Sequence, residues 1–232
     1  MIQFNLLIPY FVHKLKSRND EFEECLHENL QNPLIKNVYL FYEGYNSTDN
    51  NLRYSPMMRT IPKLNIWSVE SRPGYEEFIR FANIQLNNSY CIIANTDIMF
   101  DETLGKIQEE HLDNTLLALT TYNSHDNYKY LRCYKGGSQD SWIFKTPFKE
   151  FSCDIKLGVG YCECLFHILC KKNGINVINP SIDIFTRHLH SGADIPHTAG
   201  RNDQIDGENY INDCFLRSEY WSYIIPQKLE II

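Results

Sequence analysis

Asp97 is the acidic side chain whose position in the sequence best suits metal chemistry. It follows the apolar run Tyr90–Ala94 and stands directly after the polar pair Asn95 and Thr96. Mg²⁺ and Mn²⁺ prefer carboxylate oxygens and keep coordination positions open for phosphate oxygens. Asp97 is therefore a candidate ligand for a divalent cation. The alternative interpretation is a capping role for a helix that begins after Phe100.

Two further acids follow glycine-rich segments and are candidates for a catalytic base. Glu163 comes shortly after residues 158–160 (Gly-Val-Gly), at the expected start of a helix, where the helix dipole stabilises a carboxylate. Asp140 follows Gly136 and Gly137 and opens an expected strand. Either carboxylate could take a proton from a hydroxyl group. Each is also compatible with an ordinary role, Glu163 in a first helical turn and Asp140 in a turn.

Two histidines, His188 and His190, alternate on an expected strand, so their side chains face the same side. Neutral imidazole is a common metal ligand. We expect one of the two to join Asp97 in holding the cation.

An α/β framework is expected to position these residues. In the first half, strands are predicted at residues 2–9, 38–42, 64–69 and 90–94, with helices at 18–30 and 76–86. This order predicts a mostly parallel sheet flanked by helices. Ligands of such sheets bind beyond the carboxyl ends of the strands. Pro9, Glu43 and Asp97 all stand at such ends.

The second half is more mixed. Strands are predicted at residues 115–121, 141–145, 177–178 and 182–188, helices at 162–172 and 209–221, and a long surface loop earlier at 45–63. No repeat or linker divides the 232 residues, so we expect a single domain over 1–232.

The composition excludes several classes of protein. The net charge of −7 argues against a general nucleic-acid binder, because such a chain repels a phosphate backbone. The eight cysteines include no Cys-x-x-Cys pair, which predicts reduced thiols. No apolar run approaches the roughly 18 residues of a spanning helix, and the first residues lack the basic region of a signal peptide. We expect a cytoplasmic protein, in the host cytoplasm if the source is a virus.

The order of these motifs resembles the GT-A glycosyltransferases, particularly small members from bacterial and large-virus glycan pathways. The resemblance rests on LLIPYF at the first strand, Gly74 with Ala82-Asn83, Asn95-Thr96-Asp97 at the Asp-x-Asp position, Cys162-Glu163 with Gly174, and His188 or His190. It covers most of residues 2 to 192. Two positions depart from the family pattern: Asn95 replaces the first acid of the metal motif, and Cys162 replaces one of an acidic pair.

The resemblance implies a nucleotide-sugar donor, most often a UDP-sugar, a glycan acceptor and a divalent metal, Mn²⁺ or Mg²⁺. A single base fits inversion at the anomeric carbon. By the same resemblance, the nucleoside pocket would be lined by Pro9, Tyr10 and Glu43. Contacts to base, ribose or phosphate would come from Arg72, Tyr75 and Asn83, with Asn95, Thr96 and Asp97 completing the donor site.

Two other functions remain open from the sequence. A nucleotidyltransferase would normally carry a glycine-rich loop after the first strand, whereas PYFVHKLKSR contains no glycine. A catalytically inactive domain that binds a glycan or nucleotide sugar is favoured by Asn95 and Cys162.

Overall fold

The structure, a computed structural model, describes residues 2–43, 61–124, 127–131, 138–160, 162–189 and 224–230. The predicted helix at 209–221, most of the predicted loop at 45–63 and His190 lie outside these ranges.

Within the described ranges, the central element is a seven-stranded sheet of order β3-β2-β1-β4-β8-β6-β9. All neighbouring pairs are parallel except those of β8, which runs antiparallel to both β4 and β6. The predicted mostly parallel α/β sheet is therefore confirmed. The strands are β1 (Phe4–Tyr10), β2 (Ile35–Glu43), β3 (Leu64–Val69), β4 (Tyr90–Ala94), β6 (Thr115–Thr120), β8 (Gln139–Lys145) and β9 (Asn176–Ile178).

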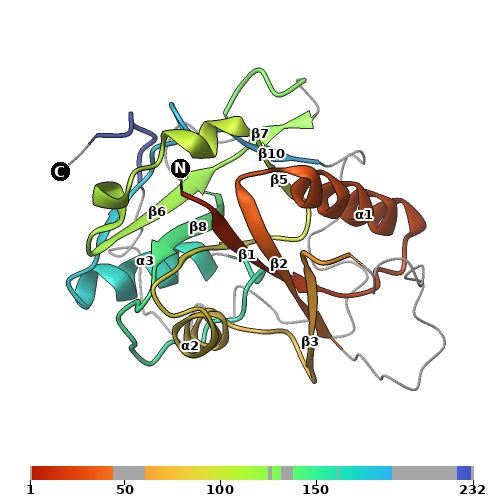
Figure 1. The fold of residues 1–232 in the computed structure, drawn as a ribbon, viewed down its shortest axis with the longest axis horizontal. Coiled ribbons are helices and arrows are strands. Elements are labelled where there is room, and N and C mark those ends of the chain that lie inside the picture. Colours follow the sequence, from red (N-terminus) through yellow and green to blue (C-terminus); the bar gives the residue numbers. More distant parts are fainter. Residues whose placement is uncertain are drawn as a thin grey trace.

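Helices cover both faces of this sheet (Figure 1). On one face, α2 (Tyr75–Gln85) and α3 (Cys162–Lys172) pack against residues such as Leu7 and Ile93. On the other, α1 (Lys16–Gln31) and the short 3₁₀ helices η2 (Glu102–Lys106) and η3 (Glu109–Leu112) pack against Leu6 and Ile92. Burial on both faces explains why β1 and β4 are continuous apolar runs rather than alternating patterns.

A second sheet extends from the edge where β4 ends. Within the described ranges it has three strands in the order β5-β10-β7: β5 (Ile98–Phe100), β10 (Thr186–His188) and β7 (Tyr122–Asn123). The sequence did not predict β5 or β7. The strand predicted at 182–188 is shorter than expected, because turns occupy residues 181–183.

The helix α1 holds β5 in place through one side chain. Asn29 Nδ2 donates to the carbonyl of Ile98 (2.8 Å), and its Oδ1 accepts from the amide of Phe100 (3.1 Å). The capping role considered for Asp97 belongs instead to Asp101, whose side chain accepts from the amide of Thr103 at the start of η2.

Candidate functional site

The turn Asn95-Thr96-Asp97 joins β4 to β5 at the carboxyl edge of the central sheet. Thr96 Oγ1 donates to the carbonyl of Pro9 at 2.6 Å, which ties the turn to β1. The amide of Leu189 donates to the carbonyl of Asp97 at 3.0 Å and ties it to the segment after β10. The backbone around Asp97 is thus fixed from both sides. Pro9, a predicted site residue, contributes the carbonyl oxygen that accepts the hydrogen bond from Thr96.

Asp97 is almost fully buried, at 8% exposure, and its carboxylate meets two basic side chains. Arg18 Nη2 donates to Oδ2 at 2.6 Å, and His188 Nε2 lies 3.1 Å from the same oxygen. Burial alone would raise the pKa of Asp97, but His188 and Arg18 outweigh burial and hold that pKa well below its usual range. Asp97 therefore carries its negative charge at neutral pH.

The pairing of Asp97 with His188 fits the donor set of a divalent cation. A carboxylate oxygen and an imidazole nitrogen are both ligands that divalent cations accept. Asp97 Oδ2 and His188 Nε2 are separated by 3.1 Å. The other ring nitrogen, Nδ1, lies 3.1 Å from Asn123 Oδ1 on β7. A partner of this kind fixes the ring orientation of a metal-binding histidine.

The number of protein ligands at this point is small. No group of three or more His, Cys, Asp or Glu side chains suited to a metal occurs among the residues that the structure describes. The pair therefore fits a cation that takes most of its ligands from phosphate oxygens and water, as Mg²⁺ often does. His190, the other predicted ligand, lies outside the described residues.

Arg18 is a member of this cluster that the sequence did not reveal. It lies on α1, its guanidinium is 5.0 Å from the ring centre of Phe22, and it forms ion pairs with both Glu21 and Asp97. The pattern of apolar residues on α1 identifies the buried face but not a buried arginine on it. Its partner Asp97 is 79 residues away in the sequence, and only the tertiary fold brings the two together.

Asp140 stands beside the metal motif because β8 runs antiparallel and begins at the carboxyl edge. Its Oδ1 accepts from Asn95 Nδ2 (3.0 Å) and its Oδ2 from Thr121 Oγ1 (3.1 Å). An aspartate at position 95 could not donate and would place two carboxylates face to face. The contact thus gives a physical reason for Asn95, the residue that departs from the family motif.

Glu163 occupies the first turn of α3, as predicted, and is partly exposed. Cys162 Sγ lies 3.6 Å from Glu163 Oε2. Further along β8, Trp142 packs on Tyr75 and Phe166 beneath α2 and α3.

Three of the predicted donor-binding residues lie at or near the carboxyl edge. Tyr10 ends β1 and stacks on Tyr42 with ring centres 5.5 Å apart. Burial raises the pKa of Tyr10 above its usual range, so its hydroxyl stays protonated. Glu43 ends β2 and is partly exposed. Arg72 follows β3, is buried, and Nη1 donates to the carbonyl of Gly158 at 3.3 Å.

The structure places two other predicted residues away from such a role. Tyr75 is fully buried, stacked on Phe166 at 4.0 Å between ring centres, and belongs to the core. Asn83 lies near the C-terminal end of α2, where its side chain bonds to the backbone amide and carbonyl of Phe148. Because β4 starts beside this point, Asn83 lies at the sheet edge opposite Asp97. The donor contacts expected for Tyr75 and Asn83 thus find no support.

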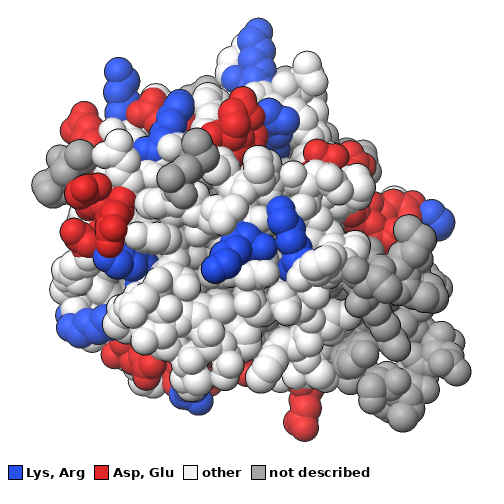
Figure 2. All heavy atoms as spheres, in the orientation of Figure 1, with Lys and Arg blue, Asp and Glu red and all other residues white. Residues whose placement is uncertain are grey.

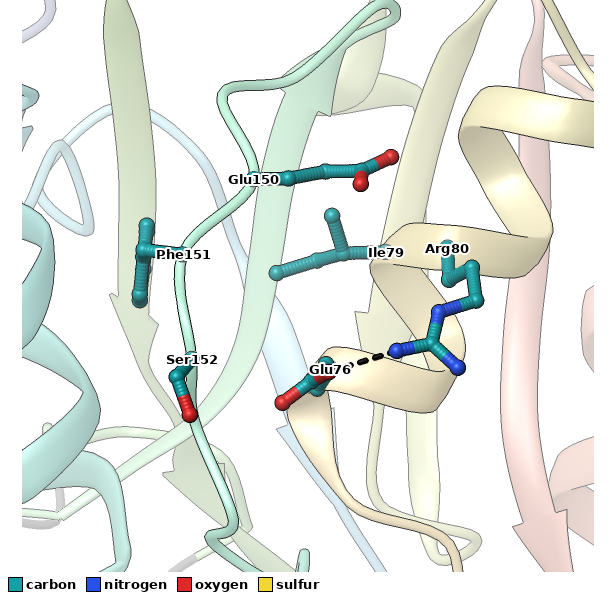
Figure 3. A pocket seen from close by; sticks show the side chains of 6 residues that line it. All are labelled: Glu76, Ile79, Arg80, Glu150, Phe151 and Ser152. Carbon is teal, nitrogen blue, oxygen red and sulfur yellow. Dashed lines mark hydrogen bonds and ion pairs between the residues drawn. The ribbon is translucent and has the colours of Figure 1, made fainter.

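A surface hollow of about 280 Å³ lies between α2 and residues 150–152 (Figure 3). Glu76 and Arg80, paired at 2.6 Å, line one wall, and Glu150, Phe151 and Ser152 line the other. The hollow contains none of the predicted site residues. It is separate from the cluster around Asp97.

Comparisons with known proteins identify the fold. No family model matches the sequence, and no curated protein matches it. Among solved structures, TarS from S. aureus in complex with UDP-GlcNAc superposes with a TM-score of 0.52 at 14% identity, over 83% of this chain and 60% of that one. The mannosyltransferase PcManGT from Pyrobaculum calidifontis, in complex with GDP-Man and Mn²⁺, gives 0.53 at 12% identity, over 84% and 59%.

The chain thus spans about three fifths of the length of these two structures. The chain has the GT-A-like fold of the nucleotide-sugar transferases.

Proposed function

We propose that the protein is a glycosyltransferase that moves a sugar from a nucleoside diphosphate sugar, with UDP as the carrier, to a glycan hydroxyl. The observation that carries this proposal is the Asp97–His188 pair, 3.1 Å apart at the carboxyl edge of a GT-A sheet. The donor class is supported by the neighbours, which hold UDP-GlcNAc and GDP-Man.

Asp97 and His188 would hold Mn²⁺ or Mg²⁺, with Asn123 orienting the imidazole and Thr96 fixing the turn. When bound, the cation supplies Lewis-acid stabilisation of the departing diphosphate. The neighbour PcManGT holds Mn²⁺. Asp97 is suited to this role because it is ionised, its carbonyl accepts from the amide of Leu189 after β10, and its neighbour Thr96 is hydrogen-bonded to β1.

The nucleoside would lie over the ends of β1 and β2, where Pro9, Tyr10 and Glu43 are found. Arg72 would contact phosphate oxygens, since a guanidinium pairs with two oxygens at once. Asn95 acts indirectly, by donating to Asp140 and keeping the turn in register with β8.

Glu163 is the favoured base for the acceptor hydroxyl. Its carboxylate is partly exposed, so an acceptor can reach it, and it stands on the first turn of α3. Asp140 is more deeply buried, and both its oxygens accept hydrogen bonds that hold Asn95 and Thr121. One carboxylate acting on one hydroxyl fits a single displacement with inversion of the anomeric carbon.

Comparing Glu163→Gln with Asp140→Asn shows which of the two carboxylates acts as the base. Sugar transfer is measured from a panel of UDP-sugars with Mn²⁺, and UDP binding is measured in parallel. Glu163→Gln should lower turnover by roughly 100- to 10,000-fold while UDP binding survives. If Glu163→Gln keeps near-parent turnover and Asp140→Asn loses it with UDP binding intact, the base is Asp140.

A reducing compartment, which we propose to be the cytoplasm, agrees with the thiols. Six cysteines in the described ranges are free and buried, and burial raises the pKa of each: Cys25, Cys91, Cys153, Cys162, Cys164 and Cys170. Among the described helices, none has the length and apolar character needed to cross a membrane. Figure 2 shows basic side chains near acidic ones toward the periphery of one face, and basic side chains among uncharged residues in its middle.

A further inference from the structure

Arg18 stands between two carboxylates at the candidate cation site. One guanidinium nitrogen, Nη2, donates to Asp97 at 2.6 Å, and the other, Nη1, pairs with Glu21. The side chain is only 10% exposed and lies over the ring of Phe22. In this arrangement Arg18 supplies positive charge to the same oxygen of Asp97 that faces His188.

We propose that Arg18 is a built-in competitor of the divalent cation, occupying Asp97 when the site is empty and lowering the affinity of the protein for the metal alone. This inference rests on the proposed function, because it assigns the regulation of that same cation site. A divalent ion bound at Asp97 Oδ2 would stand next to a guanidinium that is 2.6 Å from the same atom.

Electrostatics gives the direction of the effect. Two like charges a few ångströms apart in a buried site repel strongly, since screening there is weak. The cation therefore binds Asp97 only against the field of Arg18 or after Arg18 moves. Glu21 and Phe22, both on α1, give the displaced guanidinium a place to remain. If Arg18 had only a packing role, replacing it would loosen the cation site and weaken metal binding, whereas the proposed competition predicts that metal binding becomes tighter.

The test is Mn²⁺ binding without any nucleotide, followed by the electron paramagnetic resonance signal of free Mn²⁺ at low ionic strength. Arg18→Gln and Arg18→Met remove the charge and keep much of the stem. Both should bind Mn²⁺ more tightly than the parent, by on the order of tenfold. Arg80→Gln is the matched control, because Arg80 pairs with Glu76 on α2 outside the site. Its Mn²⁺ affinity should equal that of the parent.

Unchanged or weaker Mn²⁺ binding by both Arg18 variants overturns the inference. In that case the proposed cation site still stands if the parent binds Mn²⁺ and Asp97→Asn does not, because only the role of Arg18 has then failed. If Mn²⁺ binding does not depend on Asp97 in any variant, the inference and the proposed cation site fail together.

A second measurement uses the parent protein, so that it does not depend on the folding of an Arg18 variant. The Nε–H resonance of Arg18 is followed by NMR during addition of Mg²⁺. It should shift in the parent and stay in place in Asp97→Asn. A resonance that does not move while Mg²⁺ binds at Asp97 overturns the inference.

Discussion

His167 should make the stability of the protein depend on pH. Its ring is fully buried between α3 and β8, where Trp142 Nε1 donates to His167 Nε2 at 2.8 Å. Burial, together with nearby Lys171, lowers the pKa of His167 to about 3. In the unfolded chain the pKa of a histidine is about 6.5. The folded state therefore holds the neutral ring, while the unfolded state takes up a proton as the pH falls.

The sign and size of the effect follow from this difference in pKa. Because the folded pKa is the lower one, the contribution to stability is complete above pH 6.5 and is lost as the pH falls toward 3. Each pH unit below 6.5 costs about 1.4 kcal/mol. Between pH 7.5 and pH 5.0, His167 alone should lower the free energy of unfolding by about 2 kcal/mol.

The assay is urea denaturation of the parent and of His167→Gln at pH 7.5 and 5.0. Glutamine keeps an acceptor for Trp142 but does not titrate, so the variant should lose about 2 kcal/mol less than the parent over this range. His27→Gln is a matched control on the exposed side of α1 and should follow the parent. An equal loss of stability in the parent and in His167→Gln would refute the reasoning.

Two further changes test the packing that positions the site. A Cβ at Gly74 would stand 2.8 Å from the carbonyl oxygen of Ile155, so Gly74→Ala should lower the free energy of unfolding, measured by urea denaturation, by about 1–3 kcal/mol. The control Gly160→Ala, which has open space around the added Cβ, should be nearly neutral, and equal effects of the two substitutions would contradict this account. Asn95→Asp places a second carboxylate against Asp140 and should lower the free energy of unfolding at pH 7.5 by about 1–3 kcal/mol in the same urea assay. An unchanged free energy of unfolding would show that the Asn95–Asp140 contact is unimportant for stability.

The elements with strong local patterns were predictable from the sequence. The bounds of β3, β4 and α3 agree with the prediction, because each is a run with one clear periodicity or a continuous buried stretch. The strands β5 and β7 have three and two residues, too few to show any period. They exist because side chains such as Asn29 and pairing with β10 hold them.

Residues of the candidate site could be predicted from the sequence only where a reactive side chain stands at the end of a strand or at the start of a helix. Asp140 contacts Asn95, two residues before Asp97, because antiparallel β8 starts at the edge where β4 ends, which sequence order alone does not show. Arg18 and Asn123 reach the cluster through tertiary contacts with Asp97 and His188. Tyr75 and Asn83 had suitable side chains, but packing against Phe166 and bonding to Phe148 give them structural roles.

The most direct test of the central claim is calorimetric titration of UDP into the parent protein and into Asp97→Asn, with Mn²⁺ and with EDTA. The account predicts that the parent binds UDP when Mn²⁺ is present, that EDTA removes most of this binding, and that Asp97→Asn, while still folded, shows little binding in either condition. Equal UDP binding by the parent and Asp97→Asn, or binding that EDTA leaves unchanged, would contradict a metal-assisted donor site at Asp97.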